Sequence, residues 1–108
     1  MRRAPLLIVL ALPACTSYAH DVERTCSAPS RSKYETKEQQ DREAQFKLMM
    51  EWAEGQAGTP EGKALTQEAL HAPMYSRAKL LRTAQAKAGL SSCELADWVE
   101  NGENARVR

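Results

Sequence analysis

This 108-residue chain contains three cysteines, Cys15, Cys26 and Cys93. Most of the covalent chemistry that its side chains can undergo falls to these thiols. The opening segment, described below, predicts export, after which Cys15 is either removed or modified with lipid. Cys26 and Cys93 then remain as an even pair in an oxidising compartment, where such pairs are usually structural. We therefore predict a Cys26–Cys93 disulfide. The chain-entropy model gives it about 4 kcal/mol for a loop of about 68 residues.

Thiol redox chemistry is the alternative role for these cysteines. Cys93 is expected in the first turn of a helix, where the helix dipole lowers the pKa of a thiol. The chain contains no Cys-x-x-Cys sequence, and no resolving cysteine lies close to Cys26 or Cys93 in sequence. The pattern therefore favours a structural role, and a redox protein is the less favoured hypothesis.

The two histidines, His20 and His71, offer a copper-binding hypothesis. If the leader is cut before His20, the mature chain begins with an α-amine and an imidazole on one residue, and nitrogen ligands of this kind suit copper. With His71 as a third nitrogen, the set would resemble the histidine brace of copper oxygenases. Two histidines without a family spacing are a weak metal pattern, and His71 fits an ordinary cation at a helix C-terminus. We predict no metal and no other cofactor, with copper binding left as an alternative.

Carboxylates gather in two segments, Glu51 with Glu54, and Glu94 with Asp97 and Glu100. Paired carboxylates can act as acid and base when their surroundings separate their pKa values. Asp and Glu are seldom buried without a partner, so solvated helix faces are the better interpretation. The sequence also lacks the motifs of a catalytic triad, a phosphate-binding loop or a dinucleotide site. We expect a protein without catalytic residues.

Methionine and aromatic side chains recur at helical spacing in the middle of the chain. Phe46 and Met49 belong to one apolar stripe, Trp52 widens it, and Met74 lies on the apolar face of a later helix. Such side chains can line an adaptable groove for a peptide or an apolar ligand. They are also the main material for a core, and core filling is the preferred interpretation. A residual groove beside Trp52 is the leading binding-site hypothesis.

Residues 1–19 have the pattern of a signal peptide. Two arginines precede an apolar run over residues 4–14, which is shorter than the ~20 residues that span a bilayer. Small residues at Ser17 and Ala19 predict cleavage before His20. The processed protein is then expected to have no transmembrane span.

A second processing route is open at Cys15. The sequence Leu12-Pro13-Ala14-Cys15 resembles the lipobox of bacterial lipoproteins, in which the cysteine receives lipid. Pro13 fits that motif poorly, so ordinary cleavage is preferred. The predicted location is periplasmic or secreted, and attachment to a bacterial membrane through lipid is the alternative.

Charge and composition limit the kinds of partner that the protein is expected to bind. Beyond residue 19 the chain carries 13 basic and 14 acidic residues, so its formal charge is −1. A near-neutral domain has no general attraction for a phosphate backbone, and nucleic-acid binding through bulk charge is not expected. A hydrophobic content of 43% is normal for a globular chain. The sequence leaves the oligomeric state undecided.

The elements that position these residues are predicted to be helices. Val and Ile are scarce beyond the leader, which disfavours a sheet, whereas the helix formers Glu, Gln, Lys and Ala are abundant. A mixture of Ser, Pro and charges over 20–33 predicts an extended arm. Residues 34–102 are expected to form the helical domain, and residues 103–108 a flexible tail. Helices are predicted over 34–54, 60–71, 73–88 and 91–101.

Local sequence marks where these helices begin. Ser32 with Glu35 and Ser91 with Glu94 have the spacing of capping boxes. Gly62 weakens its helix by about 1 kcal/mol relative to alanine. The predicted fold is therefore an all-α bundle of about four helices, with an N-terminal arm joined to the last helix by the disulfide.

Short motifs give the chain a resemblance to other proteins. They are Glu51-Trp52-Ala53-Glu54, Pro60-Glu61-Gly62-Lys63-Ala64-Leu65, Leu80-Leu81 and Ala88-Gly89-Leu90-x-x-Cys93-x-Leu95-Ala96. With these motifs, residues 20–100 look like a group of small uncharacterised proteins, exported or lipid-anchored, from myxobacteria and relatives. Members often have Pro directly after the second cysteine, where this chain has Glu94. The resemblance implies an exported helical protein and implies no activity.

These observations together predict a non-catalytic exported module of the cell envelope that binds an envelope protein or peptide. Two alternatives remain, a copper or thiol-redox protein and a simple lipid-tethered envelope lipoprotein.

Overall fold

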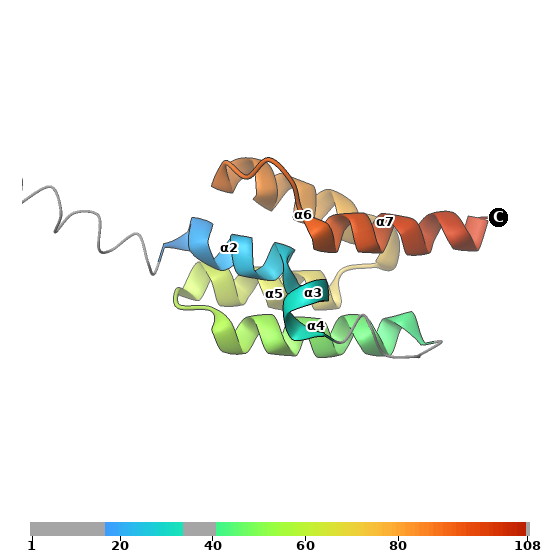
Figure 1. Cartoon of the computed structure of the whole chain (residues 1–108), viewed down its shortest axis with the longest axis horizontal. Coiled ribbons are helices and arrows are strands. Elements are labelled where there is room, and N and C mark those ends of the chain that lie inside the picture. The colour runs from blue at the N-terminus through green and yellow to red at the C-terminus, as the bar shows by residue number, and fades with distance from the viewer. Residues whose placement is uncertain (1–16, 34–40, 108) are drawn as a thin grey trace, which may run out of the picture.

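The structure, a computed structural model, describes residues 17–33 and 41–107, with side chains as far as Gly102. The predicted leader up to residue 16, including Cys15, lies outside the described residues. Within the described ranges the chain forms six helices and no strand (Figure 1). These are α2 (Tyr18–Cys26), α3 (Ala28–Ser32), α4 (Arg42–Gln56), α5 (Pro60–His71), α6 (Met74–Ala88) and α7 (Glu94–Val107). The predicted all-α class is confirmed.

Helix α2 is the central element of the bundle. It contacts each of the other five described helices, and in Figure 1 it runs between the α4–α5 pair and the α6–α7 pair. The four residues that it buries are Asp21, Val22, Thr25 and Cys26. The prediction of an extended arm over 20–33 is therefore wrong, because this segment forms the helix around which the others pack.

The hydrophobic pattern did not reveal α2 because two of its four buried side chains are polar. Asp21 and Thr25 are 2% and 1% exposed, so the apolar positions alone show no helical stripe. The break that separates α2 from α3 is local: the Ser27 hydroxyl donates to the Glu23 carbonyl over 2.9 Å. Pro29 lies in the first turn of α3, where proline is tolerated.

Helix α4 begins later than the sequence predicted. Its N-cap is Asp41, whose side chain accepts a hydrogen bond from the Ala44 amide over 3.1 Å. Of the predicted capping box, Glu35 lies outside the described residues and Ser32 ends α3. Helices α5 and α6 begin within one residue of their predicted starts. Gly89 ends α6 in the left-handed conformation (φ 77°), as glycine at that position favours.

Helix α7 differs from its prediction at both ends. It begins at Glu94, so Glu94 occupies the first turn and its carboxylate accepts a hydrogen bond from the Ser30 hydroxyl over 2.8 Å instead of closing a box with Ser91. The helix continues through Gly102 to Val107. The prediction of a flexible tail over 103–108 is therefore wrong as far as residue 107, because glycine within a helix costs only about 1 kcal/mol and does not force an end.

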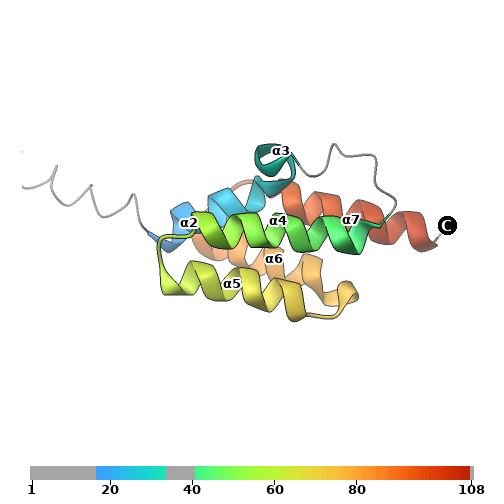
Figure 2. The same cartoon turned by 90° about the horizontal axis from the view of Figure 1, so that it is seen from below.

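The core follows the predicted apolar stripes. Its largest fully buried hydrophobic side chains are Phe46, Met49, Met50, Leu81, Leu95 and Val22. Figure 2 shows α4 beside α5, with α7 continuing beyond them. Among the described residues, no helix combines the length and apolar character that crossing a bilayer requires.

Candidate functional site

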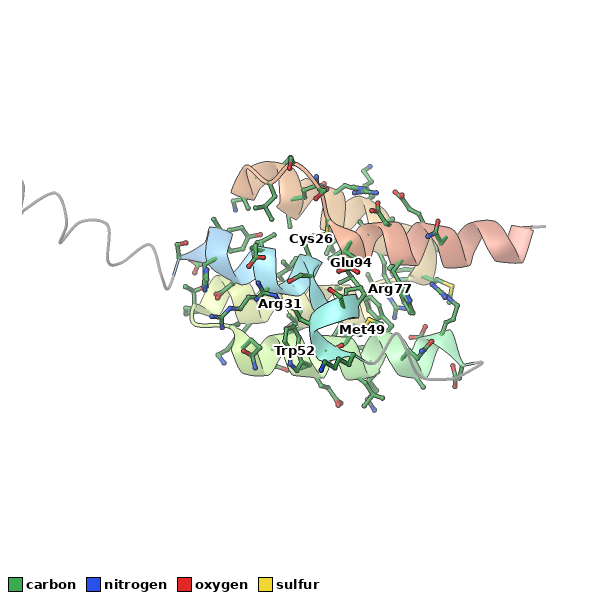
Figure 3. All side chains as sticks on the ribbon, viewed as in Figure 1. Cys26, Arg31, Met49, Trp52, Arg77 and Glu94 are labelled. Carbon is green, nitrogen blue, oxygen red and sulfur yellow. A yellow bond between two sulfur atoms is a disulfide. The ribbon has the colours of Figure 1, made fainter. Side chains whose placement is uncertain are left out.

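The two cysteines predicted to pair lie at bonding distance in the structure. Cys26 ends α2 and Cys93 immediately precedes α7. Their Cα atoms are 4.6 Å apart, within the range of disulfides, and the bond joins positions 67 residues apart. Both residues are buried, and Figure 3 labels Cys26 where α2 meets the start of α7. A buried bond between two elements of the core has the position of a structural disulfide.

Asp21 joins α2 to the turn between α4 and α5. Its carboxylate accepts hydrogen bonds from the amides of Gly58 and Thr59, each over 2.9 Å, and from the Thr59 hydroxyl over 2.6 Å. Burial raises the pKa of Asp21, but these hydrogen bonds, with that of the Thr59 hydroxyl foremost, lower the pKa to below its usual value. An ionised carboxylate that already accepts three hydrogen bonds is a poor proton acceptor, so Asp21 serves the fold.

The same contact explains why a glycine stands in the first turn of α5. A Cβ atom on Gly62 would lie 2.6 Å from the Cβ atom of Asp21, far closer than two carbon atoms can approach. Gly62 also donates its amide to the Thr59 hydroxyl over 3.0 Å. Glycine therefore lets α2 approach α5 closely enough for the carboxylate to reach its donors.

Arg77 is the one described cationic residue that the fold buries. Its guanidinium donates to the carbonyls of Ala69 and Leu70, each over 3.0 Å, which caps the C-terminus of α5. It also makes a bidentate pair with Glu43 at 2.9 and 2.8 Å and lies 4.2 Å above the ring of Phe46. Arg77 therefore links α4, α5 and α6 through hydrogen bonds at the edge of its guanidinium and the contact of one face with Phe46.

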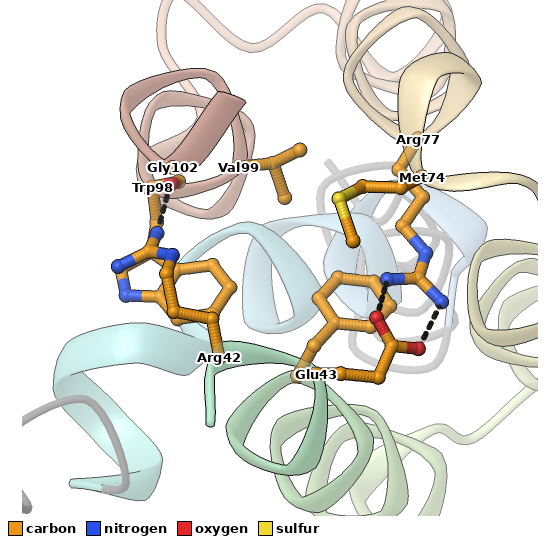
Figure 4. Close-up of a pocket in the computed structure, with 8 residues that line it drawn as sticks. Arg42, Glu43, Met74, Arg77, Trp98, Val99 and Gly102 are labelled. Carbon is orange, nitrogen blue, oxygen red and sulfur yellow. Dashed lines mark hydrogen bonds and ion pairs between the residues drawn. The ribbon is translucent and has the colours of Figure 1, made fainter. Parts of the chain in front are cut away.

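A small pocket lies between Arg77 and a second arginine, Arg42 (Figure 4). Arg42 lies 3.8 Å above the ring of Trp98 and donates to the Trp98 carbonyl. The cavity volume is about 30 Å³, enough for about two water molecules. Its lining residues are Arg42, Glu43, Phe46, Met74, Arg77, Trp98, Val99 and Gly102. Because both guanidiniums are engaged and the space is so small, the pocket does not offer an anion site.

The four residues of the predicted binding groove are not brought together. Phe46 and Met74 line the small pocket, whereas Met49 and Trp52 do not. Phe46 and Met49 are fully buried, and Trp52 is half-buried against the core. Figure 3 labels Met49 and Trp52 on α4. The positions of Phe46 and Met49 favour the core-filling interpretation, and a groove beside Trp52 stays a prediction.

A larger groove that the sequence did not suggest lies over α5 and α6, beside the start of α2. Its volume is about 410 Å³. We call it the α5–α6 groove, and its lining residues are Tyr18, Leu65, Glu68, Ser76, Lys79, Leu80, Thr83, Ala84 and Lys87. The Lys87 ammonium lies 5.0 Å from the centre of the Tyr18 ring. Burial raises the pKa of Tyr18, with smaller contributions from Glu68 and Glu61.

The positions of two leucines in the sequence are a signal for this groove. Leu80 lies off the main apolar stripe of α6, and Leu65 lies on the stripe of α5. Two adjacent helices whose apolar arcs are wider than their mutual contact leave exposed apolar surface between them. Tyr18 could not have been placed there, because the sequence assigned it to the leader.

The candidate metal ligands lie apart, and two of the candidate carboxylates share an arginine. His20 lies in the first turn of α2 and His71 ends α5, and these two helix ends lie at opposite ends of the bundle (Figures 1 and 2). The described residues contain no cluster of three or more His, Cys, Asp or Glu that could hold a metal. Asp97 and Glu100 both accept hydrogen bonds from Arg82, which links α7 to α6 on the surface.

The described residues form a small all-α bundle with a disulfide in its core, buried charges that join helices, and an open groove over α5 and α6. No family model matches the chain, and no curated protein or solved structure is significantly similar to it. The resemblance to small myxobacterial proteins therefore stays a prediction.

Proposed function

We propose that this protein is an exported, non-catalytic module of the cell envelope that binds a peptide segment of another envelope protein in the α5–α6 groove. Export is supported by the Cys26–Cys93 pair, because a buried disulfide of this kind is maintained in oxidising compartments. A non-catalytic role is supported by the two buried charged side chains, because their hydrogen bonds hold the fold together. Asp21 and Arg77 each satisfy backbone groups of a neighbouring helix or turn.

The observation that carries the binding proposal is the α5–α6 groove itself. Its volume of about 410 Å³ falls within the range of ligand sites. Half-buried Leu80 supplies apolar surface above the buried side chains of Leu65 and Ala84, and two exposed lysines of α6, Lys79 and Lys87, also line the groove. Lys79 and Lys87 are eight positions apart, so their Cα atoms lie about 12 Å apart along the helix.

Two lysines against the single carboxylate of Glu68 give the groove lining a net positive charge, which supports an acidic occupant. An extended peptide with two carboxylates about four residues apart matches the lysine separation, since an extended chain advances about 3.3 Å per residue. Apolar side chains between the two carboxylates would face Leu80 and Ala84. We therefore propose an acidic, apolar peptide segment, bound by side-chain burial along the groove and by ion pairs at its edge.

Site-specific photo-crosslinking tests this proposal in the native envelope. A photoreactive side chain at position 79 should give a discrete adduct, whereas the same group at Lys47, an exposed lysine of α4 outside the groove, should not. The crosslinked segment, mapped by mass spectrometry, should contain acidic residues flanking apolar ones.

Matched leucine substitutions separate binding from folding. Leu80→Glu should abolish the adduct, and Leu48→Glu on exposed Leu48 of α4 should not, while circular dichroism confirms that both variants are folded. Equal adducts from positions 79 and 47, or an adduct that survives Leu80→Glu, would refute the peptide groove. Alkylation of both Cys26 and Cys93 without prior reduction would refute the exported, oxidised state.

A further inference from the structure

A third cavity lies against one cysteine of the Cys26–Cys93 disulfide. Its volume of about 280 Å³ is close to the lower end of the range of ligand sites. We call it the disulfide pocket. Its wall consists of Glu23, Cys26 and Ser27 at the end of α2, residues 90–92 before α7, and Glu94 at the start of α7. Cys93 is not part of this wall, so the pocket approaches the bond from the side of Cys26.

Access decides which sulfur of a disulfide a thiolate attacks, and the other sulfur then leaves. Cys26 is 4% exposed and Cys93 is 1% exposed, so an incoming thiol needs a cavity to reach the bond. A thiol that enters the disulfide pocket meets Cys26 in the wall, and of the segment around Cys93 it meets only the neighbouring residues. Cys26 is therefore the cysteine open to attack.

Cys93 occupies the position from which a sulfur leaves more easily. It immediately precedes α7, and its carbonyl accepts a helical hydrogen bond from the Asp97 amide over 3.1 Å. A thiolate at the N-terminus of a helix is stabilised by the amides and the dipole of the first turn. The charge of Glu94 opposes this effect, but the Glu94 carboxylate accepts a hydrogen bond from the Ser30 hydroxyl of α3 over 2.8 Å. Position and access therefore favour the same direction of opening.

We propose that the disulfide exchanges with a dithiol protein of the envelope through Cys26, and that Cys93 is the cysteine that leaves and later closes the bond again. The inference goes beyond peptide binding in the α5–α6 groove. It rests on the proposed export, because an oxidising compartment maintains the bond.

The exchange balances with the dithiol as its co-reactant. A thiolate of the partner attacks the Cys26 sulfur, so a new S–S bond forms while the Cys26–Cys93 bond breaks. The Cys93 thiolate takes up the proton that the partner thiol released. The second thiol of the partner then attacks the partner's own sulfur in the mixed disulfide and frees the Cys26 thiol. The partner is oxidised by two electrons, this chain is reduced by two, and the reverse steps close the bond in the folded chain.

The charge of the disulfide pocket favours one kind of partner. The charged residues of its described lining are Glu23 and Glu94. Arg31 offsets part of this negative charge, because its guanidinium lies 3.4 Å from the Glu23 carboxylate. Figure 3 labels Cys26, Arg31 and Glu94 where α2, α3 and α7 meet. A partner whose reactive cysteine has uncharged or basic neighbours therefore reaches Cys26 faster than one with acidic neighbours.

Trapping on the native oxidised chain tests the direction of opening. The folded protein, purified from the envelope without reductant, is treated with limiting 2-mercaptoethanol, and N-ethylmaleimide then blocks the free thiols. Peptide mass spectrometry should find the mercaptoethanol predominantly on Cys26 and the maleimide on Cys93. The same treatment in urea, where the disulfide pocket is lost, should give this pattern and its opposite in comparable amounts.

Two tryptophan substitutions and two charged thiols test the pocket itself. Ser91→Trp fills the disulfide pocket from an exposed position and should lose most of the reactivity with 2-mercaptoethanol. Lys47→Trp, at an exposed position of α4 outside the pocket, should react like the parent, and circular dichroism confirms that both variants are folded. At low ionic strength, cationic cysteamine should open the bond of the folded parent about five- to tenfold faster than anionic 2-mercaptoethanesulfonate, relative to the same two thiols acting on the chain in urea.

Mercaptoethanol found mainly on Cys93, or equally on both cysteines of the folded chain, would overturn the inference, and this result does not depend on whether Ser91→Trp folds. A folded Ser91→Trp that reacts like Lys47→Trp would also overturn it. Equal relative rates for the two charged thiols would overturn the assignment of the partner's charge. Native Cys26 and Cys93 that are alkylated without reductant would overturn the export proposal as well, whereas a native disulfide that opens at Cys93 would leave export intact.

Discussion

Replacing Gly62 with alanine should destabilise the protein, although helix propensity alone predicts the opposite. Alanine in the interior of α5 would gain up to about 1 kcal/mol relative to glycine. The new Cβ atom, however, would lie 2.6 Å from the Cβ atom of Asp21, and overpacking of this kind costs about 1–3 kcal/mol. Any shift of Asp21 also weakens its three hydrogen bonds from Gly58 and Thr59, and bonds to a charged group are worth about 1.5–3 kcal/mol each. We therefore expect a net loss of about 2–4 kcal/mol in the free energy of unfolding.

Gly55 provides the matched control. It lies in α4, and a Cβ atom there would meet nothing within 4 Å. Gly55→Ala should therefore raise the free energy of unfolding by about 0.5–1 kcal/mol. Urea denaturation of the oxidised protein, followed by circular dichroism, measures both variants against the parent. The close approach of α2 to α5 would be refuted if Gly62→Ala raised the denaturation midpoint as Gly55→Ala does.

Three further changes test the other contacts that join the helices. Replacing Cys26 and Cys93 together by alanine should lower the free energy of unfolding by about 4 kcal/mol, because the bond closes a loop of 67 positions; thermal melts that coincide with the parent would contradict a disulfide. Arg77→Met should lower the free energy of unfolding by about 2 kcal/mol in urea denaturation, because two carbonyls of α5 lose a buried charged donor. The half-exposed ion pair with Glu43 adds little to this loss. A loss no larger than that of an ordinary surface substitution would show that the cap is unimportant. The lowered pKa of Asp21 means that its contribution to stability is complete above pH ~4 and disappears as the pH falls through the folded pKa. Thermal melts should therefore show the parent losing more stability than Asp21→Asn below that pH, and parallel profiles would contradict it.

The sequence predicted the individual helices better than it predicted what holds them together. Three local features depend on side chains within a few positions of one another: the apolar stripe with Phe46 and Met49, the helix start at Pro60 and the helix end at Gly89. Each was found where local propensity put it. The pairing of Cys26 with Cys93 followed from the number of cysteines, because removal or lipidation of Cys15 on export leaves these two.

The contacts missed by the sequence involve polar partners far apart in the chain. Asp21 meets its donors 37 and 38 positions away, and Arg77 meets Glu43 34 positions away. A polar side chain is expected on the surface unless its partner is known. The α5–α6 groove was missed for a related reason, since the sequence could not show which apolar residues another helix would cover.

The sequence by itself determined that this protein is all-helical, roughly where four of its helices lie, and that one pair of cysteines should join. These properties follow from backbone propensity, short-range spacing and residue counts. Only the tertiary structure decided that residues 18–26 form the central helix, that Gly62 must lack a side chain, and that Ser17 caps this helix. Those properties depend on hydrogen bonds and close packing between segments that meet only when the chain folds.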